Sequence, residues 1–147
     1  MHISPLLAPV VALVAWSLVM QVWMYVARIG AMRRQGMSVK GVRGTRGLDG
    51  VIPDEANWSA HNYAHLMEQP TIFYAIVFAL ILMGFDAPIN VYLAWGYVGL
   101  RVVHSVLQST VNIVLYRFLI FNLASLCLLG LTVHAGVRIL HECGIIG

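Results

Sequence analysis

Charged residues are scarce in this chain of 147 residues: they make up 10% of it, and only six are acidic. Hydrophobic residues make up 60%, and the mean hydropathy is +0.81. Soluble domains contain roughly 45 to 50% apolar residues. The composition therefore excludes an ordinary soluble domain and predicts an integral membrane protein. No nucleic-acid partner is expected.

Cysteine is rarer still, with only Cys127 and Cys143 in the chain. If the helix that carries Cys127 continues, the two lie roughly 24 Å apart at a rise of 1.5 Å per residue. A disulfide needs Cα atoms closer than about 7 Å. The sequence therefore predicts no disulfide and does not indicate a redox compartment.

Lysine and arginine are absent before the first apolar run, residues 5–27, whose flank reads MHIS. A secretory signal has a basic flank and an apolar region of about 7 to 15 residues. The first run is longer than that and lacks the basic flank. We therefore expect it to be a permanent helix.

Four apolar runs occupy residues 5–27, 66–85, 91–116 and 118–140. A helix needs about 20 apolar residues to cross about 30 Å of hydrocarbon. Short connections make neighbouring helices antiparallel. We predict one all-α domain, residues 1–147, folded as an integral membrane four-helix up-down bundle. Its helices are expected at roughly 5–30, 57–85, 90–113 and 117–141, with a bend at Pro70 because proline interrupts helical hydrogen bonding.

Acidic residues are missing between residues 28 and 46, where six of the nine lysines and arginines lie. Positive loops of membrane proteins face the cytoplasm. The loop 28–56 is therefore expected to be cytoplasmic, with both termini on the opposite side, and a bacterial inner membrane is the expected location. The same loop has a second possible role, which is to bind acidic lipid headgroups or another anionic ligand.

Polar residues fall on one side of the second and third helices. On each helix four of them occupy an arc of about 80°. The second helix carries Asn57, His61, His65 and Glu68, and the third carries Arg101, His104, Gln108 and Asn112. Polar groups are costly to expose to lipid, so these stripes should face protein or a cavity. Together with Arg117 they predict a polar pocket open to the cytoplasm.

Each of these residues also has a structural interpretation. Polar side chains often hydrogen-bond between membrane helices without further function. Arg101 lies nearest the middle of the membrane, and Glu68 is the only acid within the spans, so a structural ion pair between them is expected. His134 lies toward the other side and is interpreted as structural or interfacial.

A metal site is the third hypothesis for this region. His61 and His65 are one helical turn apart and Glu68 follows, while His104 could supply a fourth ligand for zinc or iron. Two histidines at this spacing are a weak signal. No metal ligands are assigned.

The pattern resembles the MAPEG family, the membrane-associated proteins in eicosanoid and glutathione metabolism. The resemblance spans the chain and depends on the four helices, the polar first loop and the segment RVVH, residues 101–104, followed thirteen residues later by Arg117. The family also has a second-helix motif of the form Arg-x-x-x-Asn-x-x-Glu followed by proline. Counted back from Glu68, the family's arginine falls on His61 and its asparagine on His65. Gln108 and Phe121 replace two family tyrosines.

The resemblance implies roles for individual residues. Glu68 matches the glutamate that holds the amino group of glutathione, and His104 matches a ligand-contact position. Arg117 matches the arginine thought to stabilise the glutathione thiolate, and Arg33 or Arg34 matches one that reaches a carboxylate. The remaining expected binding residues of the pocket are His61, His65, Gln108 and Asn112. The family forms homotrimers with glutathione between subunits, so a homotrimer is expected here.

The expected function is therefore that of a glutathione-dependent membrane transferase or peroxidase acting on lipophilic electrophiles, with Arg117 as the catalytic residue. Glutathione is the expected cofactor, and the expected partners are a second and third copy of the chain, a lipophilic small-molecule substrate and membrane lipids. The alternative is a non-catalytic protein of the same fold that binds a lipid, an anionic small molecule or a partner protein.

Overall fold

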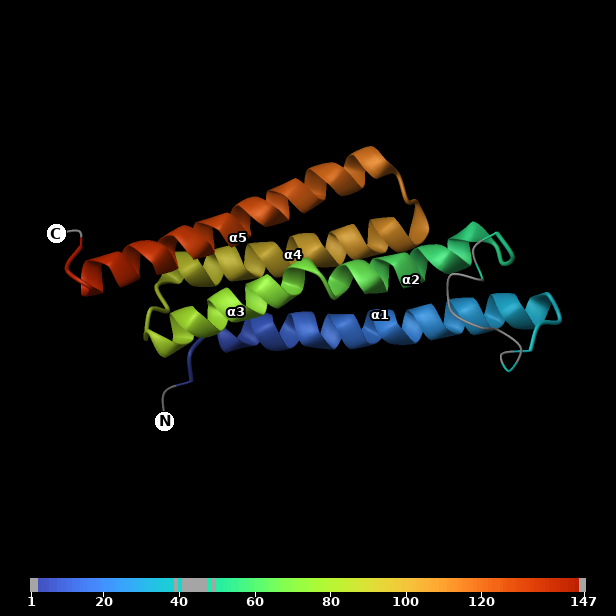
Figure 1. The fold of residues 1–147 in the computed structure, drawn as a ribbon, viewed down its shortest axis with the longest axis horizontal. Coiled ribbons are helices and arrows are strands. Elements are labelled where there is room, and N and C mark those ends of the chain that lie inside the picture. Colours follow the sequence, from blue (N-terminus) through green and yellow to red (C-terminus); the bar gives the residue numbers. More distant parts are fainter. Residues whose placement is uncertain (1–2, 39, 41–47, 49, 146–147) are drawn as a thin grey trace.

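The computed structural model describes residues 3–38, 40, 48 and 50–145, and the regular structure in these ranges is helical. The helices are α1 (Leu7–Arg34), α2 (Asp54–Leu66), α3 (Gln69–Leu82), α4 (Pro88–Thr110) and α5 (Val114–Glu142). Figure 1 shows an elongated bundle in which α3 continues the path of α2, so the chain crosses the bundle four times. Both termini lie at the same end. The predicted all-α four-helix fold is confirmed.

Three segments of the described chain are long and apolar enough to cross a membrane: α1, the continuous stretch Asp54–Leu82, and α5. The fourth, α4, has 23 residues but carries the polar stripe that contains Arg101 and His104, and it is not among those three. Both of these side chains are buried within the bundle. The protein is a membrane protein in which α4 turns the Arg101 and His104 part of its polar stripe inward.

The basic loop begins later than expected. Residues 28–34, predicted as its start, form the last turns of α1. Arg28 donates from Nη2 to Oδ1 of Asn57 at 3.1 Å, and Asn57 donates from Nδ2 to the Leu48 carbonyl at 3.4 Å. These bonds join α1, the loop and α2, which gives Asn57 a structural role. Arg43 and Arg46, on which the orientation prediction partly depends, lie outside the described residues.

The predicted bend at Pro70 is a complete break between α2 and α3. Proline has no N–H and its ring clashes with the carbonyl of the residue four positions earlier. Pro70 therefore lies in the first turn of a new helix, while Glu68, with φ −90° and ψ −90°, forms the junction. The Thr71 hydroxyl donates to the Glu68 carbonyl at 2.6 Å and satisfies part of the broken backbone.

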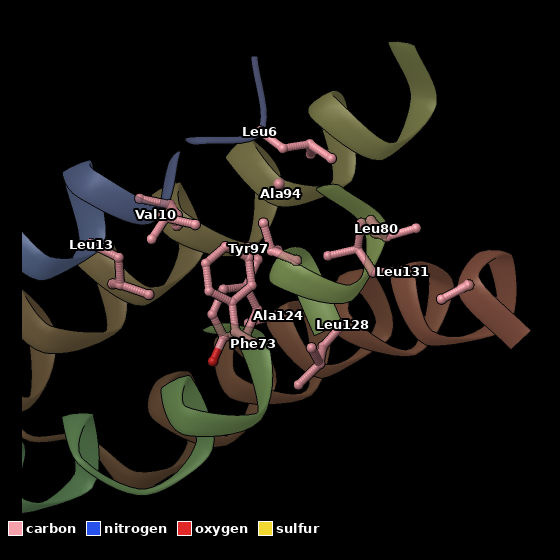
Figure 2. Packing of buried hydrophobic residues seen from close by; sticks show 13 residues of the cluster. Leu6, Val10, Leu13, Phe73, Leu80, Ala94, Tyr97, Ala124, Leu128 and Leu131 are labelled. Atoms are coloured by element: carbon pink, nitrogen blue, oxygen red, sulfur yellow. The ribbon is translucent and has the colours of Figure 1, made fainter. Parts of the chain in front are cut away.

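The apolar core lies at the end of the bundle that contains the termini, where α1, α3, α4 and α5 meet (Figure 2). Phe73 of α3 stacks on Tyr97 of α4, with ring centroids 4.5 Å apart and an interplanar angle of 12°. Leu13, Leu80 and Leu131 pack in the same cluster and are fully buried. This core fixes α4 in the centre and positions the polar half of the bundle.

Close packing of α4 on α5 depends on Gly130. A Cβ at this position would lie 3.0 Å from Cδ1 of Leu93, whereas one at Gly136 on the same helix would meet nothing within 4 Å. We expect Gly130→Val to destabilise the folded protein by about 2 kcal/mol through overpacking, and Gly136→Val to be nearly neutral. Denaturation in mixed micelles, followed by circular dichroism, measures both. Equal losses of stability in the two variants would show that the close contact with Leu93 does not determine the cost of a side chain at Gly130.

Candidate functional site

Arg101 is the largest fully buried side chain among the described residues. Its Nη2 donates to the backbone carbonyl of His65 at 2.9 Å. The ion pair expected between Arg101 and Glu68 is wrong, because the Glu68 carboxylate instead binds Nδ1 of His65 at 2.9 Å. The Glu68 carboxylate is thus taken by a histidine on its own segment, and the buried cation of Arg101 binds a carbonyl.

The break at Pro70 explains this choice of partner. In a continuous helix the carbonyl of His65 would accept from the backbone N–H of Gln69. Here it accepts only a long bond of 3.4 Å from the N–H of Glu68, so it is available to Arg101. The C-terminal end of a helix also carries partial negative charge, which favours a cation. Arg101 therefore caps α2.

Three rings gather beside this cap: His65 of α2, His104 of α4 and Phe121 of α5, here called the aromatic cluster. The His65 ring centroid lies 5.2 Å from each of the other two, and those of His104 and Phe121 are 6.1 Å apart. The Arg101 guanidinium carbon lies 5.7 Å from the Phe121 centroid. The structure thus brings together Glu68, His65, His104 and Arg101, four of the residues selected from sequence.

The metal hypothesis is not supported by this geometry. No group of three or more His, Cys, Asp or Glu side chains that could hold a metal ion occurs among the described residues. His65 uses Nδ1 to bind Glu68, and its ring lies against those of His104 and Phe121. His61 is exposed on α2 one turn earlier.

Arg117 is positioned by the short turn between α4 and α5. Asn112 in this turn has a φ of 54°, a left-handed conformation that asparagine tolerates better than most residues. Its Oδ1 accepts from Nη1 of Arg117 at 2.7 Å. The turn therefore orients Arg117 in the first turn of α5. Asn112 belongs to the site as the residue that orients Arg117.

Several buried hydrogen-bonding atoms of α4 and its neighbours have no partner within the described part of the chain. They include Nδ1 of His104, Oε1 of Gln108 and Nε of Arg117. Buried polar groups are almost always hydrogen-bonded. The inner surface around these residues therefore has hydrogen-bonding capacity suited to a polar ligand or to ordered water.

Sequence reasoning missed Asn62, Ser105 and Ser109, which are buried with unpartnered side-chain atoms in the same described region. A signal was present for Ser105 alone: at 100° per residue it lies about 20° beyond the edge of the stripe that contains Arg101 and Gln108, whereas Ser109 lies about 60° beyond it. Asn62 carries no comparable signal, because it lies beside rather than within the stripe of α2. The polar interior is wider than the sequence indicated.

A chain of hydrogen bonds ends at the backbone of Phe121, one of the three residues of the aromatic cluster. Tyr97 donates its hydroxyl to Oε1 of Gln69 at 3.3 Å, and Nε2 of Gln69 donates to the Ser125 hydroxyl at 2.8 Å. Ser125 in turn donates to the Phe121 carbonyl at 2.9 Å. This chain joins α4, α3 and α5 directly after the helix break. It was not predicted from sequence.

Arg33 and Arg34 lie apart from this cluster. Both are exposed in the last turn of α1, and Arg34 lines a groove of about 540 Å³ that also contains Glu55 of α2. Among the described residues, neither arginine forms an ion pair with Glu68. One chain therefore does not bring the terminal arginines of α1 to the cluster.

His134 has a structural contact at the other end of the bundle. Its Nδ1 lies 2.7 Å from Oδ1 of Asn90, whose Nδ2 donates to the Phe85 carbonyl at 3.0 Å. These bonds join α5 to the start of α4. The contact agrees with the interpretation of His134 as structural.

Comparison with known proteins identifies the family. The model of the MAPEG family matches residues 6–137, which is most of the chain. Neither the search of curated proteins nor that of solved structures finds a match. The matched range contains every site residue discussed above, from Arg33 to Arg117. The chain belongs to the MAPEG family.

Proposed function

We propose that this protein is a glutathione-dependent membrane transferase or peroxidase acting on lipophilic electrophiles, with Arg117 stabilising the glutathione thiolate. One observation carries the proposal: polar atoms of His104, Gln108 and Arg117 are buried without a partner in the described structure, and all three residues belong to the half of the bundle that contains the Asn112 turn. Membership of a family in eicosanoid and glutathione metabolism supports it. The ligand that these atoms would satisfy is polar, with an anionic group for Arg117 and a hydrogen-bond donor for Oε1 of Gln108.

The charged and polar residues of the site match the charged groups of glutathione. At neutral pH glutathione carries two carboxylates and one ammonium, so its site needs several cations and one acid. Arg117 and either Arg33 or Arg34 would hold its anionic groups, and Glu68 would hold its ammonium. Gln108 offers an unpartnered carbonyl oxygen and His104 an unpartnered ring nitrogen, both of which can bind peptide groups.

The chemical role of Arg117 follows from charge. Bound glutathione would supply the sulfur nucleophile, and only its thiolate form is reactive. A free thiol has a pKa of about 8.5, and each unit of lowering corresponds to about 1.36 kcal/mol. A fixed guanidinium favours the anion over the neutral thiol. Asn112 keeps one edge of Arg117 engaged, so that the remaining N–H groups point in a defined direction.

A homotrimer with the site between subunits would explain the exposure of Glu68. In one chain the side chain of Glu68 is 69% exposed, although it lies midway along the spanning segment Asp54–Leu82. A carboxylate facing lipid at that depth is costly. A neighbouring copy would cover it, and would also bring the arginines of its own α1 within reach. The family forms homotrimers of this kind.

The lipophilic substrate would enter from the bilayer. The outward face of α5 exposes large apolar side chains next to Arg117, among them Tyr116, Phe118 and Leu119. An apolar electrophile or hydroperoxide dissolved in lipid would reach this face and meet the thiolate at the interface, where proximity would supply much of the rate. We also propose that the basic loop faces the cytoplasm of a bacterial cell, on the same side as Arg117.

A non-catalytic binding function is the second candidate, and one observation favours it. The Glu68 carboxylate is already bound to His65, which occupies the family's asparagine position. Phe121 has no hydroxyl where the family has a tyrosine. With the acid paired and both family phenols replaced, by Gln108 and Phe121, the pocket also suits a lipid or another anionic small molecule.

Two measurements on the purified protein test the enzymatic proposal. We expect saturable binding of glutathione by calorimetry, and conjugation of a chlorinated nitroaromatic probe by the same preparation. The matched control is ophthalmic acid, a tripeptide of the same shape that lacks the thiol: it should compete for binding without being conjugated. If neither binding nor conjugation is observed, glutathione is excluded as the ligand, and the non-catalytic binding function becomes the favoured candidate.

A further inference from the structure

The end of α5 opposite Arg117 carries a second charged site. Arg138 donates from Nη2 to Oε1 of Glu142 at 2.7 Å. Arg138 follows Arg117 by 21 residues, which on a helix corresponds to about 32 Å. This equals the thickness of the hydrocarbon core, about 30 Å. When Arg117 lies at one interface of the membrane, Arg138 and Glu142 therefore lie among the lipid headgroups of the other.

Two hollows flank Arg138 at this level. One, of about 430 Å³, lies between α5 and the start of α4, and its lining residues are Phe85, Ile89, His134, Val137, Arg138 and His141. The other, of about 440 Å³, lies toward the end of α3, and its lining residues are Met83, Arg138, Ile139, Glu142 and Cys143. Arg138 belongs to both, so a ligand that binds it can extend an apolar part into the first hollow and a cationic part toward Glu142.

The two charged side chains retain hydrogen-bonding capacity. Arg138 rests on the Phe85 ring, with its guanidinium carbon 5.5 Å from the ring centroid, and its buried Nε has no partner in the described structure. A guanidinium has five N–H donors, and only one is used by Glu142. The Glu142 side chain is 60% exposed, which leaves its carboxylate accessible to a second cation.

We propose that these hollows bind the headgroup of a phospholipid that carries both a phosphate and a primary ammonium, of the phosphatidylethanolamine type. The phosphate binds Arg138, for which guanidinium is well suited. The ammonium binds Glu142, and one acyl chain lies along Phe85, Ile89 and Val137. Because Arg138 and Glu142 neutralise each other, the site favours a zwitterionic headgroup over an anionic one. This site is separate from the proposed glutathione site.

Lipid competition on the purified full chain tests the proposal. The protein, delipidated in detergent, is offered equal amounts of phosphatidylethanolamine and phosphatidylglycerol with the same acyl chains, and bound lipid is counted by native mass spectrometry. We expect phosphatidylethanolamine to be retained about threefold more, the size of effect given by one partly exposed ion pair. Glu142→Gln should reduce the ratio to one or below, because it removes the ammonium acceptor and frees Arg138.

A control and a second lipid keep the test decisive. Glu55→Gln removes an acid at the other end of the bundle and should leave the ratio unchanged. In the unaltered protein, phosphatidylcholine should bind less than phosphatidylethanolamine, because its methylated ammonium cannot donate hydrogen bonds to Glu142. The proposal is overturned if Glu142→Gln leaves the ratio unaltered, or if phosphatidylcholine binds as well as phosphatidylethanolamine.

Discussion

Replacing Arg117 with alanine is expected to lower kcat/KM for the proposed glutathione conjugation about 100-fold. Removal of one fixed donor that stabilises a developing or full anion costs enzymes about 100-fold to 1000-fold. Arg117 is half-buried, and one of its nitrogens is held 2.7 Å from Asn112, so its position is set before a ligand binds. The measurement is the fraction of bound glutathione present as thiolate at pH 7, read by ultraviolet absorbance, together with the kinetics.

Two further variants separate charge from position. Arg117→Lys keeps the cation but loses the planar fork that binds Asn112 and a ligand at once, so it should recover only part of the activity. Asn112→Gly keeps the left-handed turn, which glycine adopts freely, and removes only the side chain that orients Arg117. We expect Asn112→Gly to lower activity about tenfold with little change in stability. An unchanged thiolate fraction in Arg117→Ala would exclude Arg117 from this role.

The inward face of α4 was predictable because its polar residues have a period, whereas the same prediction for α2 is wrong for His61 and Glu68, which are exposed. Arg101, His104 and Gln108 recur at helical spacing in an otherwise apolar segment, and a polar stripe of this kind must turn away from lipid. All three are buried in the structure, as the stripe predicted. A disturbance at Pro70 was predictable for a different reason, because the missing N–H of proline is a local property, but the predicted bend is a complete break in the structure.

The partner of Arg101 was not predictable by the same reasoning. A search for the partner of a buried cation looks for acidic side chains, and Glu68 was the only candidate in the spans. The actual partner is the backbone carbonyl of His65, which every residue possesses and which becomes available only where a helix is interrupted. Combining the break at Pro70 with the cation one helix away would have suggested a helix cap. Tertiary contacts between Phe121 and the two histidines likewise have no local signature.

The largest expected effect on stability is that of Arg101. Arg101→Ala should lower the free energy of unfolding by about 3 kcal/mol. The variant leaves a cavity where the largest fully buried side chain was, and it leaves the His65 carbonyl without a good donor. These two costs together exceed the free energy gained because a charge is no longer buried. Arg101→Met preserves most of the volume and should cost only about 1 kcal/mol. Denaturation in mixed micelles, followed by circular dichroism, measures both.

A double-mutant cycle with Pro70 distinguishes capping from packing. Pro70→Ala permits α2 and α3 to join, so that the N–H of Gln69 can reach the carbonyl of His65 and replace Arg101 as its donor. In the Pro70→Ala background, Arg101→Met should therefore cost clearly less than in the original chain, giving a coupling of about 1 kcal/mol. Strict additivity of the two substitutions would mean that the break and the buried arginine are independent features. Coupling would show that Arg101 stabilises the fold by capping the interrupted helix. The same interruption places Glu68 at the surface of the bundle.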